Sequence, residues 1–229
     1  MPPKAGVWSA GSGSTAPTPS AGWPATTSPP TGRWACAASS ICVTPSRSRR
    51  PDACRKATAP HYQNLPIEGR RWELTPYNEE VGIARYLADR YLEITEDGVA
   101  NLRTALETVA AADNAPVVVH CAAGKDRTGV LTALVLSLVG VDEDDIVADY
   151  ALTGRATERF IADWRRRHPD TPLWPGFGLA PAETMRLFLT DLTARHGSIE
   201  RYVTQVLQLS PDAVAELRAH LLTESNGAG

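Results

Sequence analysis

The order of three segments between residues 117 and 139 constrains the fold of this chain most. The apolar run Val117–Val119 is typical of a buried strand, and the ten residues HCAAGKDRTG follow it from His120 to Gly129. A helix is predicted from Thr128 to Val139. A strand, a glycine-bearing loop and a helix in this order direct backbone N–H groups toward one point. The sequence therefore predicts an anion site at this loop.

Cys121 and Arg127 are the reactive pair of the loop. Five residues separate them, so one phosphate could contact both side chains. A thiol at a helix N-terminus beside cationic side chains ionises readily, which would make Cys121 a thiolate nucleophile. Arg127 is planar and always charged, so it can hold two phosphate oxygens in a fork. The alternative is a buried structural cysteine, which would leave Lys125, Asp126 and Arg127 clustered without a reason.

The loop resembles the signature of the cysteine-dependent protein-tyrosine phosphatases, which is a His-Cys pair, five residues, an arginine and a hydroxyl residue. The run GKDRTG and the downstream IVADYALTGRA are similar to bacterial tyrosine or dual-specificity phosphatases that also accept phosphoinositides. The resemblance covers residues 60 to 229. It implies hydrolysis of a phosphorylated protein or a phosphoinositide through a cysteinyl-phosphate intermediate, with no metal or organic cofactor.

The resemblance also implies a role for each residue of the loop. Cys121 is the expected nucleophile, and Arg127 stabilises the phosphate charge. Asp126 is the expected general acid; the alternative is an acid after the strand near residues 65–67, where this chain offers Glu68 and Glu73. The residues expected to bind substrate are Ala122, Ala123, Gly124, Lys125 and Thr128, and those expected to support the loop are His120 and Gly129.

Two of these side chains, and one basic run outside the loop, each allow two interpretations. Thr128 either donates its hydroxyl to the cysteine sulfur or is only a suitable first-turn helix residue. Lys125 either contacts a second anion of the substrate or only steers anions toward the loop. The run Arg165–Arg167 is read as a solvated helix end rather than a lipid-binding surface.

The remaining pattern predicts an α/β domain. We expect a central, mostly parallel sheet flanked by helices, followed by a C-terminal helical subdomain, and the resemblance implies the same fold, of the protein-tyrosine-phosphatase type. A strand is predicted at His61–Ile67. Hydrophobic periodicity predicts helices at 77–94, 98–112, 142–152, 157–167, 182–196, 198–207 and 211–222.

Charge and cysteine content exclude several classes of function. The net charge is −3, and residues 1–60 hold seven Lys/Arg against one acid, so the remaining 169 residues carry 16 basic against 25 acidic side chains. This acidic part argues against a nucleic-acid partner. The cysteines at 36, 42 and 54 fit no zinc spacing, and the apolar run Val130–Val141 is too short for a transmembrane segment. No signal peptide is visible, so a cytoplasmic location is expected.

Two other functions fit part of the pattern. A phosphate-binding pseudophosphatase would keep the loop on an impaired sheet. A sulfur-transfer enzyme also uses a loop cysteine at a strand end, but the run Lys125–Thr128 disfavours it.

Residues 1–59 form a low-complexity segment. Ten of the 18 prolines lie between Met1 and Pro60, and no apolar period is present, which is typical of disorder. Tryptophans at 8, 23 and 34 are unusual in such a tail. The composition resembles GC-rich DNA translated out of frame, and a displaced frame over Ala37–Arg50 can encode an apolar strand. A natural Pro/Ser-rich tail is the alternative.

We hypothesise that residues from about Val7 to Thr58 are a frameshifted translation. Two strands of the sheet would then be missing, and the strands near Tyr62–Ile67 and Val117–His120 would have unpaired edges. Sequencing of the genomic DNA tests this hypothesis. We expect an open displaced frame over codons 8–58, and a displaced frame full of stop codons would contradict it.

Overall fold

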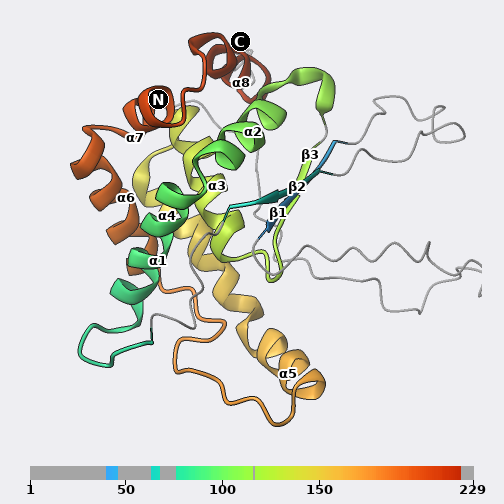
Figure 1. Cartoon of the computed structure of the whole chain (residues 1–229), viewed down its shortest axis with the longest axis vertical. Coiled ribbons are helices and arrows are strands. Elements are labelled where there is room, and N and C mark those ends of the chain that lie inside the picture. Colours follow the sequence, from blue (N-terminus) through green and yellow to red (C-terminus); the bar gives the residue numbers. More distant parts are fainter. Residues whose placement is uncertain (1–39, 46–62, 68–75, 116, 223–229) are drawn as a thin grey trace, which may run out of the picture.

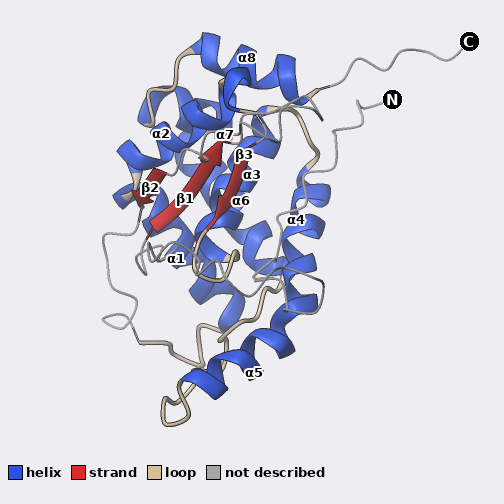
Figure 2. Cartoon of the chain, turned by 90° about the vertical axis from the view of Figure 1, so that its right-hand side faces the viewer, coloured by secondary structure: helices blue, strands red, loops and turns tan. Residues whose placement is uncertain are grey.

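The computed structural model describes residues 40–45, 63–67, 76–115 and 117–222 of the chain. In these ranges a small sheet lies on one side of a group of helices (Figures 1 and 2). The structure therefore combines helices with a sheet, as predicted, but helices make up most of it, and the sheet lies at one side of them rather than at the predicted central position.

The sheet has three strands, β1 (Ser40–Pro45), β2 (Gln63–Pro66) and β3 (Val117–His120), in the order β2-β1-β3. Strand β1 is antiparallel to both neighbours. The predicted mostly parallel sheet is therefore wrong. Strands β2 and β3 do run in the same direction, and helices connect them, but β1 lies between them and runs the opposite way.

The prediction of unpaired strand edges is also wrong. Strand β1 falls within the segment that we hypothesise to be frameshifted, and it pairs with both strands that were expected to lack partners. Its register places Ile41 opposite Leu65 and Cys42 opposite His120. The strand that carries the loop at residue 121 is thus fixed on one edge by backbone hydrogen bonds. The rest of the low-complexity segment lies outside the described residues.

Most predicted helices are present with small changes in their ends. Helix α1 begins at Ile83 rather than Tyr77, after a turn at residues 78–82, and α3 begins at Asp126 rather than Thr128. The α-helices are α1 (Ile83–Asp97), α2 (Val99–Ala110), α3 (Asp126–Leu138), α4 (Glu143–Ala151), α5 (Thr157–Arg167), α6 (Ala182–His196), α7 (Ile199–Arg201) and α8 (Pro211–Leu221). Shorter helical turns are η3 (Ala112–Asn114), η4 (Leu152–Ala156) and the π-helical η5 (Tyr202–Val206).

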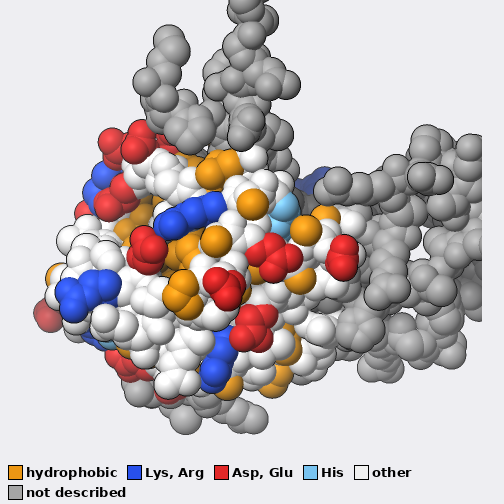
Figure 3. Space-filling view, turned by 90° about the horizontal axis from the view of Figure 1, so that it is seen from above, with side chains coloured by type: hydrophobic (Ala, Val, Ile, Leu, Met, Phe, Trp, Pro, Cys, Tyr) orange, Lys and Arg blue, Asp and Glu red, His pale blue; other side chains and the backbone are white. Residues whose placement is uncertain are grey.

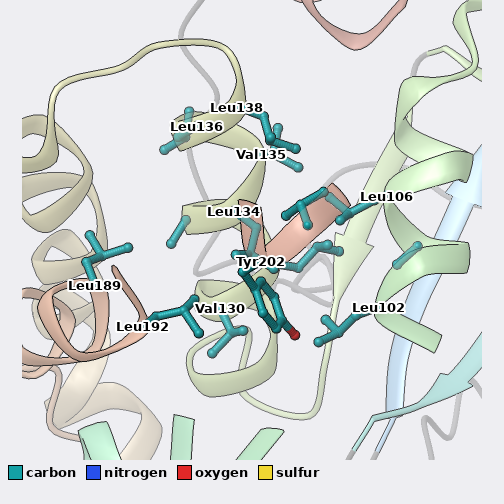
Figure 4. Close-up of a cluster of buried hydrophobic side chains, with 14 of the residues drawn as sticks. Leu102, Leu106, Val130, Leu134, Val135, Leu136, Leu138, Leu189, Leu192 and Tyr202 are labelled. Carbon is teal, nitrogen blue, oxygen red and sulfur yellow. The ribbon is translucent and has the colours of Figure 1, made fainter. Parts of the chain in front are cut away.

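Helix α3 forms the centre of the core. Eleven of its 13 residues are buried, and it contacts α1, α2, α4, α7, α8 and two strands. A helix that is apolar on all sides is stable only when other elements surround it. In Figure 4 its side chains Val130, Leu134 and Leu138 lie among residues of α2 and α6 and Tyr202.

The C-terminal helices pack into this same core rather than forming a separate subdomain. Helix α6 contacts α1 and α4, and α8 contacts α2. Phe188 and Leu192 of α6 and Leu217 of α8 belong to one hydrophobic cluster with α3. On the face seen in Figure 3, acidic and basic side chains lie next to one another. Among the described helices, none has both the length and the apolar character needed to cross a membrane.

Gly98 joins α1 to α2 at a point where the chain is tightly packed. It ends α1, with its N–H bonded to the Ile94 carbonyl, and it directly precedes α2. A Cβ at this position would lie 2.6 Å from the Ile67 carbonyl oxygen and 2.7 Å from that of Ile94. Both are backbone atoms, so a side chain at residue 98 would force the helices and the segment after β2 apart.

We therefore predict that Gly98→Ala destabilises the protein by about 1–3 kcal/mol, the usual cost of overpacking a core. Thermal unfolding measures the change as a fall in Tm. Gly154→Ala is the matched control, since a Cβ there meets no atom within 4 Å. Equal Tm values for the two variants would contradict the packing argument.

Candidate active site

The predicted loop lies between β3 and α3. Strand β3 ends at His120 and α3 begins at Asp126, so residues 121–125 make the turn. Gly124 has a φ of 66°, a conformation that favours glycine. The Gly129 N–H donates to the Lys125 carbonyl at 2.7 Å, which closes the first turn of the helix. Arg127 thus lies in that first turn, where backbone N–H groups lack helical partners.

The two side chains predicted to react with phosphate are largely shielded from water. Cys121 is 5% exposed and Arg127 is 8% exposed, whereas Ala122 is exposed. Cys121 is a free thiol. Burial strengthens electrostatic interactions, because the effective dielectric constant is lower than in water. A phosphate that reached this turn would therefore interact strongly with the guanidinium of Arg127.

Lys125 and Asp126 form a partly buried ion pair at the end of the loop. The Lys125 Nζ lies 2.7 Å from Asp126 Oδ1 and donates to the Leu179 carbonyl at 3.0 Å. The lysine is 6% exposed, so its ammonium group is held inside the protein by these two contacts. Lys125 therefore ties the loop to the segment that precedes α6.

Two buried tyrosines complete the surroundings of Asp126. The Tyr91 hydroxyl donates to Asp126 Oδ1 at 2.7 Å and lies 2.7 Å from the Tyr150 hydroxyl. Burial, and then the negative charge of Asp126, raise the pKa of Tyr91 well above its ordinary value, and the same two causes raise the pKa of Tyr150. Both phenols therefore stay neutral over the pH range in which most proteins are stable.

The remaining loop residues have distinct surroundings. The His120 Nδ1 lies 3.4 Å from the Cys121 carbonyl oxygen. The Thr128 hydroxyl is buried and has no hydrogen-bond partner among the described residues. Gly129 faces the Tyr150 ring, where a Cβ would come within 3.1 Å of the ring carbons. The first turn of α3 therefore lies so close to α4 that a side chain at residue 129 would displace the Tyr150 ring slightly.

A cleft of about 480 Å³ opens beside the loop. One wall is the loop itself, through Ala122, Ala123 and Lys125, and the opposite wall is α5. The α5 residues that line the cleft are Thr157, Arg159, Phe160, Ala162, Asp163, Arg166 and Arg167.

The α5 wall carries an excess of positive charge. Asp163 pairs with both Arg166 and Arg167, and Arg159 makes no ion pair with any residue that the structure describes. Three arginines therefore face one carboxylate. The interpretation of residues 165–167 as only a solvated helix end is incomplete, since Arg166 and Arg167 line the cleft beside the loop.

Helix α5 is attached to the rest of the molecule mainly by aromatic contacts. All 11 of its residues are at least partly exposed, and Figure 1 shows the helix projecting from the core. Phe160 stacks on Phe177 at 5.2 Å between ring centroids, and Trp164 lies 5.1 Å from the same ring. The Thr157 hydroxyl donates to the Gly178 carbonyl. The segment between α5 and α6 thus contacts both α5 and, through Leu179, the loop.

The structure gathers all the loop residues singled out in the sequence, but adds contacts that the sequence did not reveal. Tyr91 and Tyr150 lie within predicted helices, and nothing in their spacing indicated that a hydroxyl would meet Asp126. Nothing in the sequence indicated that Arg159 would line the cleft. The alternative acids Glu68 and Glu73 lie outside the described residues. Within the described ranges, no group of three or more His, Cys, Asp or Glu side chains is placed to hold a metal ion.

Comparison with known proteins finds the same family that the loop sequence resembles. Residues 44–223 match the profile of the tyrosine phosphatase family. The chain is 40% identical to the triple specificity protein phosphatase PtpB of Mycobacterium tuberculosis over 95 residues. This aligned stretch covers 40% of the chain and 34% of that protein. The chain is 27% identical to a tyrosine-protein phosphatase of Nostoc commune over 144 residues, and this stretch covers 59% of the chain and 49% of that protein. The matches thus span less than half the length of either relative.

Proposed function

Because the chain belongs to the tyrosine phosphatase family, we propose that it hydrolyses phosphomonoesters, with phosphotyrosine as the first substrate class and phosphoserine or phosphothreonine as further ones. The observation that carries the proposal is the position of Cys121 and Arg127. Both are nearly buried, Cys121 at the start of the turn and Arg127 in the first turn of the helix that follows it. Ala122, Ala123 and Lys125 of the turn border an open cleft. A phosphoryl group that entered from the cleft would meet a nucleophile and a fixed cation together.

The first step transfers the phosphoryl group to the enzyme. The Cys121 sulfur attacks phosphorus in line, the S–P bond forms, and the bond from phosphorus to the ester oxygen breaks. Arg127 and the backbone N–H groups of the turn stabilise the charge that spreads over the phosphoryl oxygens. Asp126 gives its proton to the departing oxygen, which leaves as a neutral alcohol or phenol. Lys125 then faces the carboxylate that this transfer creates.

The second step releases phosphate. Water attacks phosphorus, Asp126 accepts one of its protons, and the S–P bond breaks to regenerate the thiolate. We propose that the Thr128 hydroxyl donates to the departing sulfur. A buried hydroxyl without a hydrogen-bond partner is costly, about 1–3 kcal/mol, and is therefore suited to a partner that forms only during the reaction.

The α5 wall favours substrates that carry further negative charge, and this supports phosphoinositides as an additional substrate class. Arg159, Arg166 and Arg167 border the cleft with a single carboxylate, Asp163, among them. Arginine suits this task because its planar group binds phosphate oxygens in pairs. Residues 61–229 carry more acidic than basic side chains, so the basic α5 wall differs in charge from the rest of this part of the chain.

The proposed activity is tested with para-nitrophenyl phosphate, phosphotyrosine peptide and a short-chain phosphatidylinositol phosphate. We expect turnover of the first two by the wild-type chain and no measurable turnover by Cys121→Ser, because serine is a far weaker nucleophile. Hydrolysis of the lipid by the wild type but not by Cys121→Ser would support phosphoinositides as a substrate class. Cys54→Ser serves as the control and should behave as the wild type.

Two results would contradict this function. A wild-type chain that binds vanadate but turns over none of the three substrates would be a phosphate-binding pseudophosphatase. Turnover that persists in Cys121→Ser would exclude the phosphocysteine intermediate.

The role of Asp126 makes a separate prediction about leaving groups. We expect Asp126→Asn to lower kcat for phosphotyrosine by about 10²–10⁴-fold, the usual contribution of a general acid. With 2,4-dinitrophenyl phosphate, whose leaving group needs no proton, kcat should change little. Steady-state kinetics on both substrates measures the contrast.

Asp149→Asn is the matched control for this substitution. Asp149 is a half-buried acid on α4, and burial raises its pKa, but the proposed reaction gives it no task. Its variant should show the wild-type ratio between the two substrates. Full activity of Asp126→Asn on phosphotyrosine at every pH would move the role of general acid to another residue.

A further inference from the structure

We propose that Tyr91 is a positioning residue for Asp126: its hydroxyl holds the carboxyl group in both of the protonation states that the reaction requires. This inference rests on the proposed function, because it concerns the acid that protonates the leaving group. It assigns a task to a side chain of α1 that lies 35 positions before Asp126 in the sequence.

Tyr91 is fixed in place by its neighbours. The side chain is fully buried in α1, and its ring makes edge-to-face contacts with Tyr150 of α4 and Phe188 of α6, each at 6.0 Å between centroids. Rings packed in this way have little freedom to turn. The hydroxyl is therefore directed at the first residue of α3, and it reaches Asp126 Oδ1 at 2.7 Å.

The number of protons in this group sets the direction of each hydrogen bond. Each phenol has one proton to donate and an oxygen that accepts. An ionised Asp126 only accepts, so Tyr91 donates to it, and the bond between the tyrosines must then run from Tyr150 to Tyr91. Burial raises the pKa of both phenols, so each retains its proton for this purpose.

The same group can hold the protonated acid without reversing. When Asp126 carries its proton on Oδ2, Oδ1 remains an acceptor, so Tyr91 still donates to Oδ1 and still accepts from Tyr150. A phenol is suited to this position because it donates to Asp126 while it accepts from Tyr150, whereas an ammonium group such as that of Lys125 only donates.

The contacts also leave one carboxyl oxygen available. Tyr91 and Lys125 both contact Oδ1 of Asp126, and Oδ2 has no partner among the described residues. Fixing Oδ1 would set the direction of Oδ2 without occupying it. A general acid is effective only when its proton lies within hydrogen-bond reach of the leaving oxygen, so a carboxyl group that turns freely would transfer it less often.

The test is Tyr91→Phe in the full chain, which keeps the ring and removes only the hydroxyl. We expect kcat for phosphotyrosine to fall about tenfold, as for the loss of one hydrogen bond to a charged group, with KM within about twofold of the wild type. With 2,4-dinitrophenyl phosphate, kcat should stay within about twofold, because no proton is required. Adding Tyr91→Phe to Asp126→Asn should cause little further loss, since both act through one carboxyl group.

Tyr202→Phe is the matched control. Tyr202 is equally buried, and its hydroxyl donates to the Thr95 carbonyl at 2.8 Å, away from the loop. It should keep the wild-type ratio between the two substrates even if Tm falls. Should Tyr91→Phe fail to fold, Tyr150→Phe replaces it, because this change leaves Tyr91 without its donor and should give a smaller effect in the same direction.

The outcomes separate this proposal from the function on which it rests. An equal loss of kcat on both substrates in Tyr91→Phe would mean a merely structural role, and an unchanged kcat on both would mean no role; either result overturns the inference. Additive losses in the double variant would do the same. A wild-type chain that hydrolyses neither substrate would instead refute the proposed phosphatase activity.

Discussion

The burial of α3 on all its sides is the interaction on which the rest of this structure depends. Each of the surrounding helices presents an apolar stripe to it, so the helix is held by many contacts rather than by one interface. A helix packed in this way cannot shift without opening the core. The loop with Cys121 leads directly into its first turn, so the position of the loop is fixed by the same packing that stabilises the fold.

This arrangement compensates charge at the proposed phosphate site. The turn places charged groups next to a hydrophobic core, where an unpaired charge is costly. Asp126 is bound by Lys125 and Tyr91, and Lys125 is also bound by the Leu179 carbonyl. Charge at the base of the site is thus compensated within the protein, through elements from three distant parts of the sequence.

The sequence was informative where a structure is local and less so where it depends on distant partners. Helices α5 and α6 begin and end where periodicity predicted, since an amphipathic pattern is a property of the segment itself. The positions of Cys121 and Arg127 followed from the strand, loop and helix order. Strand β1 was not predicted, because its segment has no apolar period and the pairing depends on two strands elsewhere in the chain.

The same reasoning explains what was missed at the site. A tyrosine on the apolar face of a helix is predicted to be buried, and Tyr91 and Tyr150 are. Which polar group meets the hydroxyl depends on how α1, α4 and α3 are placed in space, which periodicity does not give. Similarly, the start of α3 moved by two residues because the Lys125 carbonyl closes the first turn, a contact that sequence spacing leaves open.

The two walls of the cleft differ in how firmly they are held, and this difference bears on specificity. The loop is anchored in the core helix, whereas α5 projects outward, has only partly exposed or exposed residues, and relies on Phe160 and Trp164 packing against Phe177 (Figure 2). The proposed phosphoryl transfer needs exact geometry, and the loop is the wall that is held firmly enough to provide it. Under the proposed function, the arginines of α5 would recognise the rest of the substrate, and substitutions of these exposed side chains disturb no core packing. Under the same proposal, substrate preference can change along α5 while the reaction at Cys121 stays the same.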